Sequence, residues 1–231
     1  SCNDSNVVVL NVYNWGEYIS DGEDETINVT AAFEEYFNNN LSEKYGHKIK
    51  VNYTTYSSNE ELYAKLTNTN TSYDVIIPSD YLVALLIREG LLHKINFENV
   101  PNFSYIDQAY IDGNYYDPSN EYSVPYNVGM VGIIYDATVV EGTPDSWSLM
   151  WDKEYKGRIL QFNNPRDAFA IAQSVLGMDY NNESEPSWRV AAELLKEQKV
   201  VSPSYVSDEV FNIIHCSGRF FSETDGVLLP F

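Results

Sequence analysis

The chain has 231 residues, of which 44% are hydrophobic and 21% charged, a composition that suits a folded protein with a substantial core. Its formal net charge is −20, and the acidic residues are spread along the sequence rather than collected in one block. This argues against a nucleic-acid partner, because phosphate recognition needs clustered Lys and Arg, and it makes a cation the natural ligand. No apolar run approaches the roughly 20 residues that cross a bilayer, and no signal segment opens the chain, so we expect a soluble, mature protein.

The predicted elements alternate between strand and helix in the first half of the chain. Val7 to Tyr13 is a β-branched, apolar run that predicts a buried strand, and Thr30 to Tyr45 carries apolar residues at helical spacing. The next predicted elements are strand Lys48 to Tyr56, helix Asn59 to Leu66, strand Tyr73 to Pro78, and helix Tyr81 to Glu89, which stops at Gly90. This rhythm predicts an α/β fold with a mainly parallel sheet, whose ligands lie beyond the carboxyl ends of the strands.

The second half opens with Glu121 to Asp136, which reads as extended chain with glycines at its middle and predicts a crossing between two lobes. The elements expected after it are helix Trp147 to Tyr155, strand Arg158 to Phe162, helix Arg166 to Leu176 ended by Gly177, and helix Pro186 to Lys199.

Two predicted loops, Asn14 to Ser20 and Pro78 to Tyr81, follow parallel strands and should share one edge of one sheet. Side chains at this rim and in the second half combine aromatic faces, carboxylates and small polar groups. The candidates are Trp15, Glu17, Tyr18, Ser79, Asp80, Tyr81, Tyr126, Asn164 and Asp167. A linear polyamine needs flat apolar walls for its methylenes and carboxylates for its ammonium groups, which this mixture supplies. The plain alternative is partly buried aromatics, since a chain with 19 tyrosines places some at any rim.

No catalytic set is recognisable in the sequence. His47, His93 and His215 are far apart, and none accompanies a serine or cysteine in a nucleophile motif. The two cysteines, Cys2 and Cys216, lack metal-ligand spacing and are too few for a disulfide framework. We therefore expect binding without chemistry, with no metal and no cofactor.

Cys2 is followed by a short polar segment, a pattern similar to the lipid-modified cysteine of a bacterial lipoprotein. A cloning remnant at this position is the alternative interpretation. The sequence leaves open which of these two interpretations of Cys2 holds.

Four ordered blocks resemble the spermidine/putrescine-binding proteins of ATP-driven (ABC) polyamine importers. They are residues 13–18 (YNWGEY), 73–103, 121–136 (EYSVPYNVGMVGIIYD) and 146–177. The resemblance implies a two-lobed periplasmic-binding-protein-like fold with mainly parallel sheets, incomplete at the C-terminus, because family members continue beyond this chain and the match fades after about Phe211. It implies a first lobe over residues 1–130 and a partial second lobe over residues 131–231, with an atypical tail from about residue 212.

The resemblance also implies a ligand site in the first lobe. The family's first binding loop falls on Trp15, Gly16, Glu17 and Tyr18, where the aromatics wall the ligand and Glu17 meets an ammonium group. A second contact set falls on Ser79 and Tyr81, and Asp80 and Tyr126 are additional candidates.

Two further implied ligands differ from the family pattern. Asn164 and Asp167 stand where the family has two acids that grip the ligand, so one acid is replaced by an amide and the other is shortened. The amide supplies no charge, which leaves the choice between putrescine and spermidine open.

The implied function is polyamine capture outside the cytoplasm, in the periplasm or on a lipid anchor, followed by delivery to a membrane permease. Closure of two lobes around the ligand would achieve this without chemistry. The alternatives are a solute-binding protein for another small cation, an enzyme such as a small-amine transferase on the same scaffold, and an adhesin or structural lipoprotein.

Overall fold

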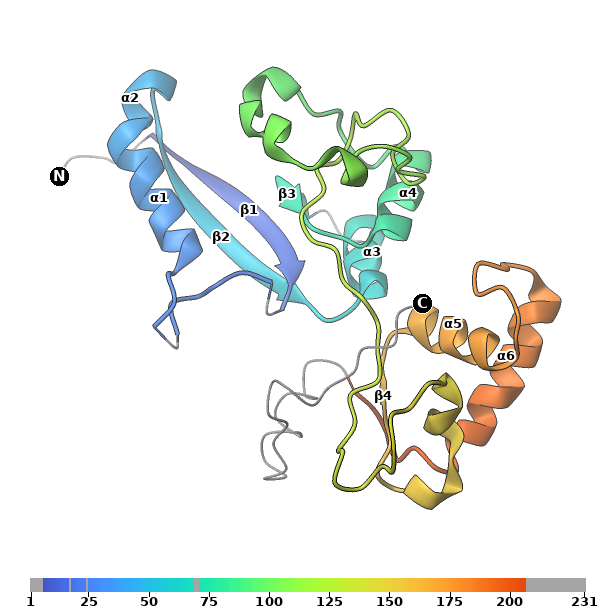
Figure 1. The fold of residues 1–231 in the computed structure, drawn as a ribbon. Coiled ribbons are helices and arrows are strands. Elements are labelled where there is room, and N and C mark those ends of the chain that lie inside the picture. The colour runs from blue at the N-terminus through green and yellow to red at the C-terminus, as the bar shows by residue number, and fades with distance from the viewer. Residues whose placement is uncertain (1–5, 17, 24, 69–70, 207–231) are drawn as a thin grey trace. The chain divides into compact units, whose positions relative to one another are not determined.

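The computed structural model describes residues 6–16, 18–23, 25–68 and 71–206 (Figure 1). The chain separates into two compact units, Ser1–Asn127 and Val128–Phe231. This division falls inside the segment Glu121 to Asp136, where a crossing was predicted. Assignment of residues 1–130 and 131–231 to two ligand-binding lobes stays a prediction.

The first unit is built on a three-stranded parallel sheet in the order β2-β1-β3. β1 (Val7–Trp15) pairs with β2 (Lys48–Tyr56) along its whole length, and with β3 (Val75–Ile76) only at Val12 and Tyr13. The parallel α/β prediction is confirmed. The carboxyl ends of β1 and β3 lie at one edge of the sheet, so the loops that follow them leave from the same side.

Seven helical segments accompany this sheet among the described residues. They are α1 (Val29–Asn40), α2 (Ser42–Tyr45), α3 (Asn59–Asn68), α4 (Asp80–Arg88), and the short 3-10 helices η1 (Phe97–Asn99), η2 (Pro101–Tyr105) and η3 (Gln108–Tyr110). The single helix predicted over Thr30 to Tyr45 is wrong, because the chain leaves helical geometry at Leu41. Three asparagines precede Leu41, and asparagine is a weak helix former.

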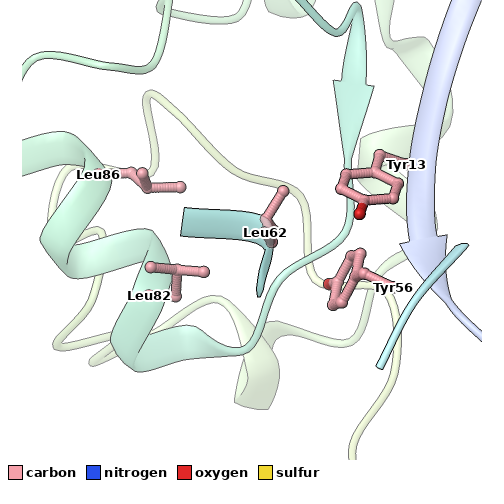
Figure 2. Close-up of a cluster of buried hydrophobic side chains, with 5 residues drawn as sticks. All are labelled: Tyr13, Tyr56, Leu62, Leu82 and Leu86. Atoms are coloured by element: carbon pink, nitrogen blue, oxygen red, sulfur yellow. The ribbon is translucent and has the colours of Figure 1, made fainter. Parts of the chain in front are cut away.

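A compact apolar core holds α3 and α4 against the carboxyl half of the sheet (Figure 2). Tyr13 of β1 and Tyr56 of β2 meet edge to face with ring centroids 5.0 Å apart, and both are almost fully buried. Leu62 of α3 and the pair Leu82 and Leu86, one turn apart on α4, complete the cluster. Burial of each such side chain is worth about 1.5–3 kcal/mol, so this core fixes the end of the sheet from which the two loops leave.

The amino-terminal half of β1 differs from the predicted buried strand. Val7, Val8 and Val9 are between 42% and 49% exposed, whereas Tyr13 is fully buried. β3 is too short to pair with this part of β1, and the core packs only against the other end of the strand. The sheet therefore carries exposed apolar surface at the end remote from the loops.

Residues 128–206, the described part of the second unit, contain two strands and two long helices. β4 (Leu160–Phe162) and β5 (Ser204–Val206) pair in parallel, and α5 (Pro165–Val175) packs on α6 (Glu185–Gln198) through Ala168, Ala172, Ala191 and Leu195. Strand β5 was not predicted, because three residues are too few to show alternation.

The segment Trp147 to Tyr155 is helical, as predicted, but it is not one continuous helix. The segment forms two 3-10 helices, η4 (Trp147–Trp151) and η5 (Lys153–Tyr155), which are separated at Asp152. Asp152 is extended, and its carboxylate accepts a hydrogen bond from the Glu154 amide at 2.9 Å, so it caps the second segment instead of continuing the first.

The outer edge of β2 is covered by side chains of α1, which lies beside it (Figure 1). The Asn38 side chain accepts from the Ile49 amide at 2.8 Å and donates to the Ile49 carbonyl at 3.0 Å, as a neighbouring strand would. Glu34 accepts from the next outward-facing amide, that of Val51. The helix thereby satisfies an edge that would otherwise be open to another strand.

We predict that Asn38→Ala lowers the free energy of unfolding by about 1–2 kcal/mol, because it leaves both Ile49 backbone groups without their partner. Urea unfolding followed by circular dichroism measures this. The matched control is Asn39→Ala, an exposed neighbour on the same helix, which should be as stable as the unchanged protein or slightly more stable because alanine favours helix. Equal stability of the two variants would contradict the role of Asn38.

Candidate functional site

A row of aromatic side chains begins at the carboxyl end of β1. Trp15 lies 4.8 Å from Tyr56 between ring centroids, and Tyr18 meets Trp15 edge to face at 6.2 Å. Tyr126 meets Tyr18 edge to face, also at 6.2 Å. These four residues, here called the aromatic row, run from a buried tyrosine to one that is 56% exposed. The row therefore offers apolar faces at the rim of the first unit.

Strand register explains how the row begins. Trp15 and Tyr56 are partners in the parallel ladder between β1 and β2, so their side chains emerge on the same face of the sheet. After Trp15 the chain turns away, and the buried side chain of Asn14 accepts a hydrogen bond from the Trp15 amide at 2.8 Å. The last pair of the ladder thus stands directly under the loop.

Tyr126 joins the row from a distant part of the sequence. Its hydroxyl donates to the Tyr18 carbonyl oxygen at 2.5 Å, across 108 positions of chain. Burial raises the pKa of the Tyr18 hydroxyl, and the neighbouring Tyr126 raises this pKa further. Tyr18 therefore remains a neutral phenol at physiological pH and can both donate and accept hydrogen bonds.

The second loop presents Ser79 and Tyr81 at the start of α4. Asn59, the first residue of α3, donates to the Ser79 hydroxyl at 3.0 Å and to the Tyr81 hydroxyl at 2.7 Å. The Ser79 amide donates to the Asn59 side-chain oxygen at 3.2 Å. Asp80 is exposed, and its carboxylate accepts from the Tyr81 amide at 2.6 Å. The two predicted hydroxyls are therefore held together by one buried asparagine.

Tyr56 connects the two loops. Its ring lies against Trp15 of the first loop, and its hydroxyl donates to the carbonyl of Ile77, directly ahead of the second loop, at 2.5 Å. Neither Tyr56 nor Asn59 was among the predicted site residues. Their only signal in the sequence was their position. Tyr56 ends the strand β2 and Asn59 begins the helix α3, so both lie next to the turn at the carboxyl end of that strand.

The structure thus accounts for most of the first-unit candidates. It brings Trp15, Tyr18 and Tyr126 into one row and Ser79 and Tyr81 into one cluster, with Gly16 directly after Trp15. Glu17, the predicted partner of an ammonium group, lies outside the described residues.

Asn164 and Asp167 belong to the second unit, at the amino end of α5. The Asn164 side-chain oxygen accepts from the Arg166 amide at 3.0 Å and so caps the helix. Asp167 is half-buried, and burial raises the pKa of its carboxyl group, with the adjacent Arg166 acting in the opposite direction. Whether these two side chains meet the same ligand as the first-unit residues stays a prediction.

A hollow of about 500 Å³ in the second unit lies beside Asn164. Its lining includes Phe169 of α5, Tyr205 of β5 and Lys199, which follows α6. The ammonium group of Lys199 lies 5.9 Å from the ring centroid of Tyr205. Asn164 therefore lines an apolar hollow and caps the helix whose first turn carries the half-buried Asp167.

In the part of the chain that the structure describes, no three side chains of His, Cys, Asp or Glu gather in a way that could hold a metal ion. None of the helices in this part of the chain has both the length and the apolar character needed to pass through a membrane.

Comparison with known proteins gives consistent matches. The family described as bacterial extracellular solute-binding protein matches residues 29–211. The spermidine/putrescine-binding periplasmic protein of Escherichia coli is 32% identical over 207 residues, which is 88% of this chain and 54% of that protein. The putrescine-binding periplasmic protein SpuD of Pseudomonas aeruginosa is 30% identical over 217 residues, which is 87% of this chain and 55% of that protein.

Solved structures agree with the sequence matches. A putative spermidine/putrescine ABC transporter protein from Listeria monocytogenes superposes with a TM-score of 0.77 at 27% identity, over 91% of this chain and 61% of that one. The TpPotD lipoprotein of Treponema pallidum gives a TM-score of 0.73 at 29% identity, over 92% of this chain and 62% of that one. The predicted fold class is therefore confirmed.

The chain spans about half the length of the relatives that it matches in sequence. The family match nevertheless covers most of the chain, including the second loop of the candidate site and the start of α5. The chain belongs to the family of bacterial extracellular solute-binding proteins.

Proposed function

We propose that this protein captures a polyamine, putrescine or spermidine, outside the cytoplasm and delivers it to the membrane permease of an ABC importer. The observation that carries the proposal is the aromatic row beside the Ser79 and Tyr81 hydroxyls, at one edge of a sheet in a chain of net charge −20. The relatives named for binding spermidine or putrescine support the same assignment.

The chemistry of a polyamine matches this surface in two respects. Its methylene chain can pack on the faces of Trp15 and Tyr18, which also attract ammonium groups through their ring electrons. Its ammonium hydrogens need acceptors, and hydroxyl oxygens such as that of Ser79 can serve. A sugar would make little use of the negative charge, and an anion would be repelled by it.

Carboxylates would supply the stronger contacts. We assign this role to Glu17 in the first loop and Asp167 in the second unit, with Asp80 as an additional candidate. Hydrogen bonds between ammonium groups and carboxylates are roughly twice as strong as those between neutral groups. Micromolar capture requires about 8 kcal/mol, which a few such bonds together with aromatic burial can provide.

The proposed mechanism is closure of two lobes on the ligand without any covalent step. Contacts made only in the closed form shift the population toward it, and the closed form then docks on the permease. We propose a periplasmic location or an anchor on the outer face of the cytoplasmic membrane. Lipid attachment at Cys2, which lies outside the described residues, would provide that anchor.

One prediction of the proposed function concerns the class of ligand. Isothermal titration calorimetry should detect binding of putrescine or spermidine but not of 1,4-butanediol, which has the same carbon chain as putrescine without its charges. Trp15→Ala should weaken amine binding by about tenfold, because the ligand loses an aromatic wall. Trp188→Ala, which removes a tryptophan that is 46% exposed on α6, is the control and should leave affinity unchanged. Heat from the diol and none from the amines would refute the proposal.

Another prediction concerns the carboxyl group of Asp167. Burial holds the pKa of its carboxyl group above the ordinary value in the folded protein. At pH values between the ordinary pKa and the raised pKa, the folded state therefore binds more protons than the unfolded state. This contribution to stability is present at low pH and is lost as pH rises through the raised pKa. Asp167→Asn should therefore gain stability relative to the unchanged protein between pH 3 and pH 7, while binding putrescine more weakly.

Thermal unfolding at the two pH values, without ligand, measures the stability part of this prediction. Asp145→Asn, at an exposed position of the same unit, is the control. It should have the same stability relative to the unchanged protein at both pH values. A stability difference between Asp167→Asn and the unchanged protein that does not grow with pH would contradict the assigned effect of burial.

A further inference from the structure

Asn59 is a buried polar residue whose placement the fold alone does not explain. It is 2% exposed and stands at the first position of α3. Asparagine at a helix start commonly caps the helix, but here Ser58 does so, because its hydroxyl accepts from the Glu61 amide at 3.1 Å. The side-chain amide group of Asn59 faces the loop after β3 instead.

The orientation of this amide follows from its partners. The Ser79 amide can only donate, so the atom of Asn59 that it meets at 3.2 Å is the side-chain oxygen. The nitrogen therefore faces the hydroxyl oxygens of Ser79 and Tyr81, at 3.0 and 2.7 Å, and gives one hydrogen to each. Both hydroxyls act as acceptors toward Asn59, so their own hydrogens point elsewhere.

We infer that Asn59 is a positioning residue for the ligand site: it fixes the separation and the hydroxyl orientation of Ser79 and Tyr81, through which it acts on the bound amine. This inference rests on the proposed function. A serine hydroxyl has two lone pairs, so accepting from Asn59 leaves Ser79 able to accept from an ammonium group as well. Preorganised acceptors bind more tightly because less motion is lost on binding.

The same contacts could instead serve only to hold α3 and α4 together. A double-mutant cycle separates the two roles, because residues that act through one another have non-additive effects. The cycle compares the unchanged protein, Asn59→Leu, the pair Ser79→Ala with Tyr81→Phe, and all three changes together. Leucine keeps the branched shape of asparagine and removes all of its side-chain hydrogen bonds.

The measurement is the dissociation constant for putrescine by isothermal titration calorimetry, at a temperature where circular dichroism shows each variant folded. Asn59→Leu should weaken binding by about tenfold when the two hydroxyls are present and by less than about threefold when they are absent. An equal loss in both backgrounds would overturn the inference. If Asn59→Leu does not fold, Asn59→Ser replaces it in the same cycle.

Asn38→Leu is the matched control, since Asn38 is a half-buried asparagine of the same unit whose side chain bonds to the β2 edge and not to the candidate site in the contacts described above. It should lower stability without changing the dissociation constant, and a loss of affinity equal to that of Asn59→Leu would overturn the inference. Failure of the unchanged protein to bind putrescine or spermidine would overturn the proposed function itself, and the inference with it. Binding without coupling would overturn the inference alone.

Discussion

The side chain of Tyr56 is the contact on which the candidate site depends. It stands at the end of β2, packs its ring against Trp15, and donates its hydroxyl to the Ile77 carbonyl in the loop after β3. Because it is buried in the same cluster as Tyr13 and Leu62, its position is set by the core rather than by the loops. A buried tyrosine in this place fixes the two loops that follow the neighbouring strands β1 and β3. It thereby gives the aromatic rings and hydroxyls at this edge of the sheet a defined arrangement.

The start of α5 in the second unit carries one neutral amide, Asn164, and one acid, Asp167. Asn164 occupies a place where the related transport proteins, as judged by resemblance, carry an acid, and its side-chain oxygen is engaged in capping α5. A single half-buried acid, Asp167, then provides the negative charge at the start of that helix, and its ionisation is opposed by burial. An ammonium group placed beside Asp167 would relieve that opposition, so ligand binding and ionisation of this acid are expected to favour one another.

Much of the fold could be predicted from the sequence because the pattern of apolar residues records which face is buried. The strand Lys48–Tyr56 and the helices α5 and α6 follow that pattern closely. It fails where structure depends on the rest of the molecule, as in the exposed valines of β1 and the 3-10 helices around Asp152. For the site, resemblance pointed to Ser79 and Tyr81 but not to Asn59, because a positioning residue is defined by contacts across 20 or more positions that no local pattern reveals.

A crystal structure of the protein with putrescine would show whether the aromatic row and the two hydroxyls form the binding site. We expect the methylene chain to lie against Trp15 and Tyr18, with an ammonium group within hydrogen-bond distance of the Ser79 or Tyr81 hydroxyl. Putrescine bound at another surface, with the aromatic row and both hydroxyls untouched, would contradict this expectation.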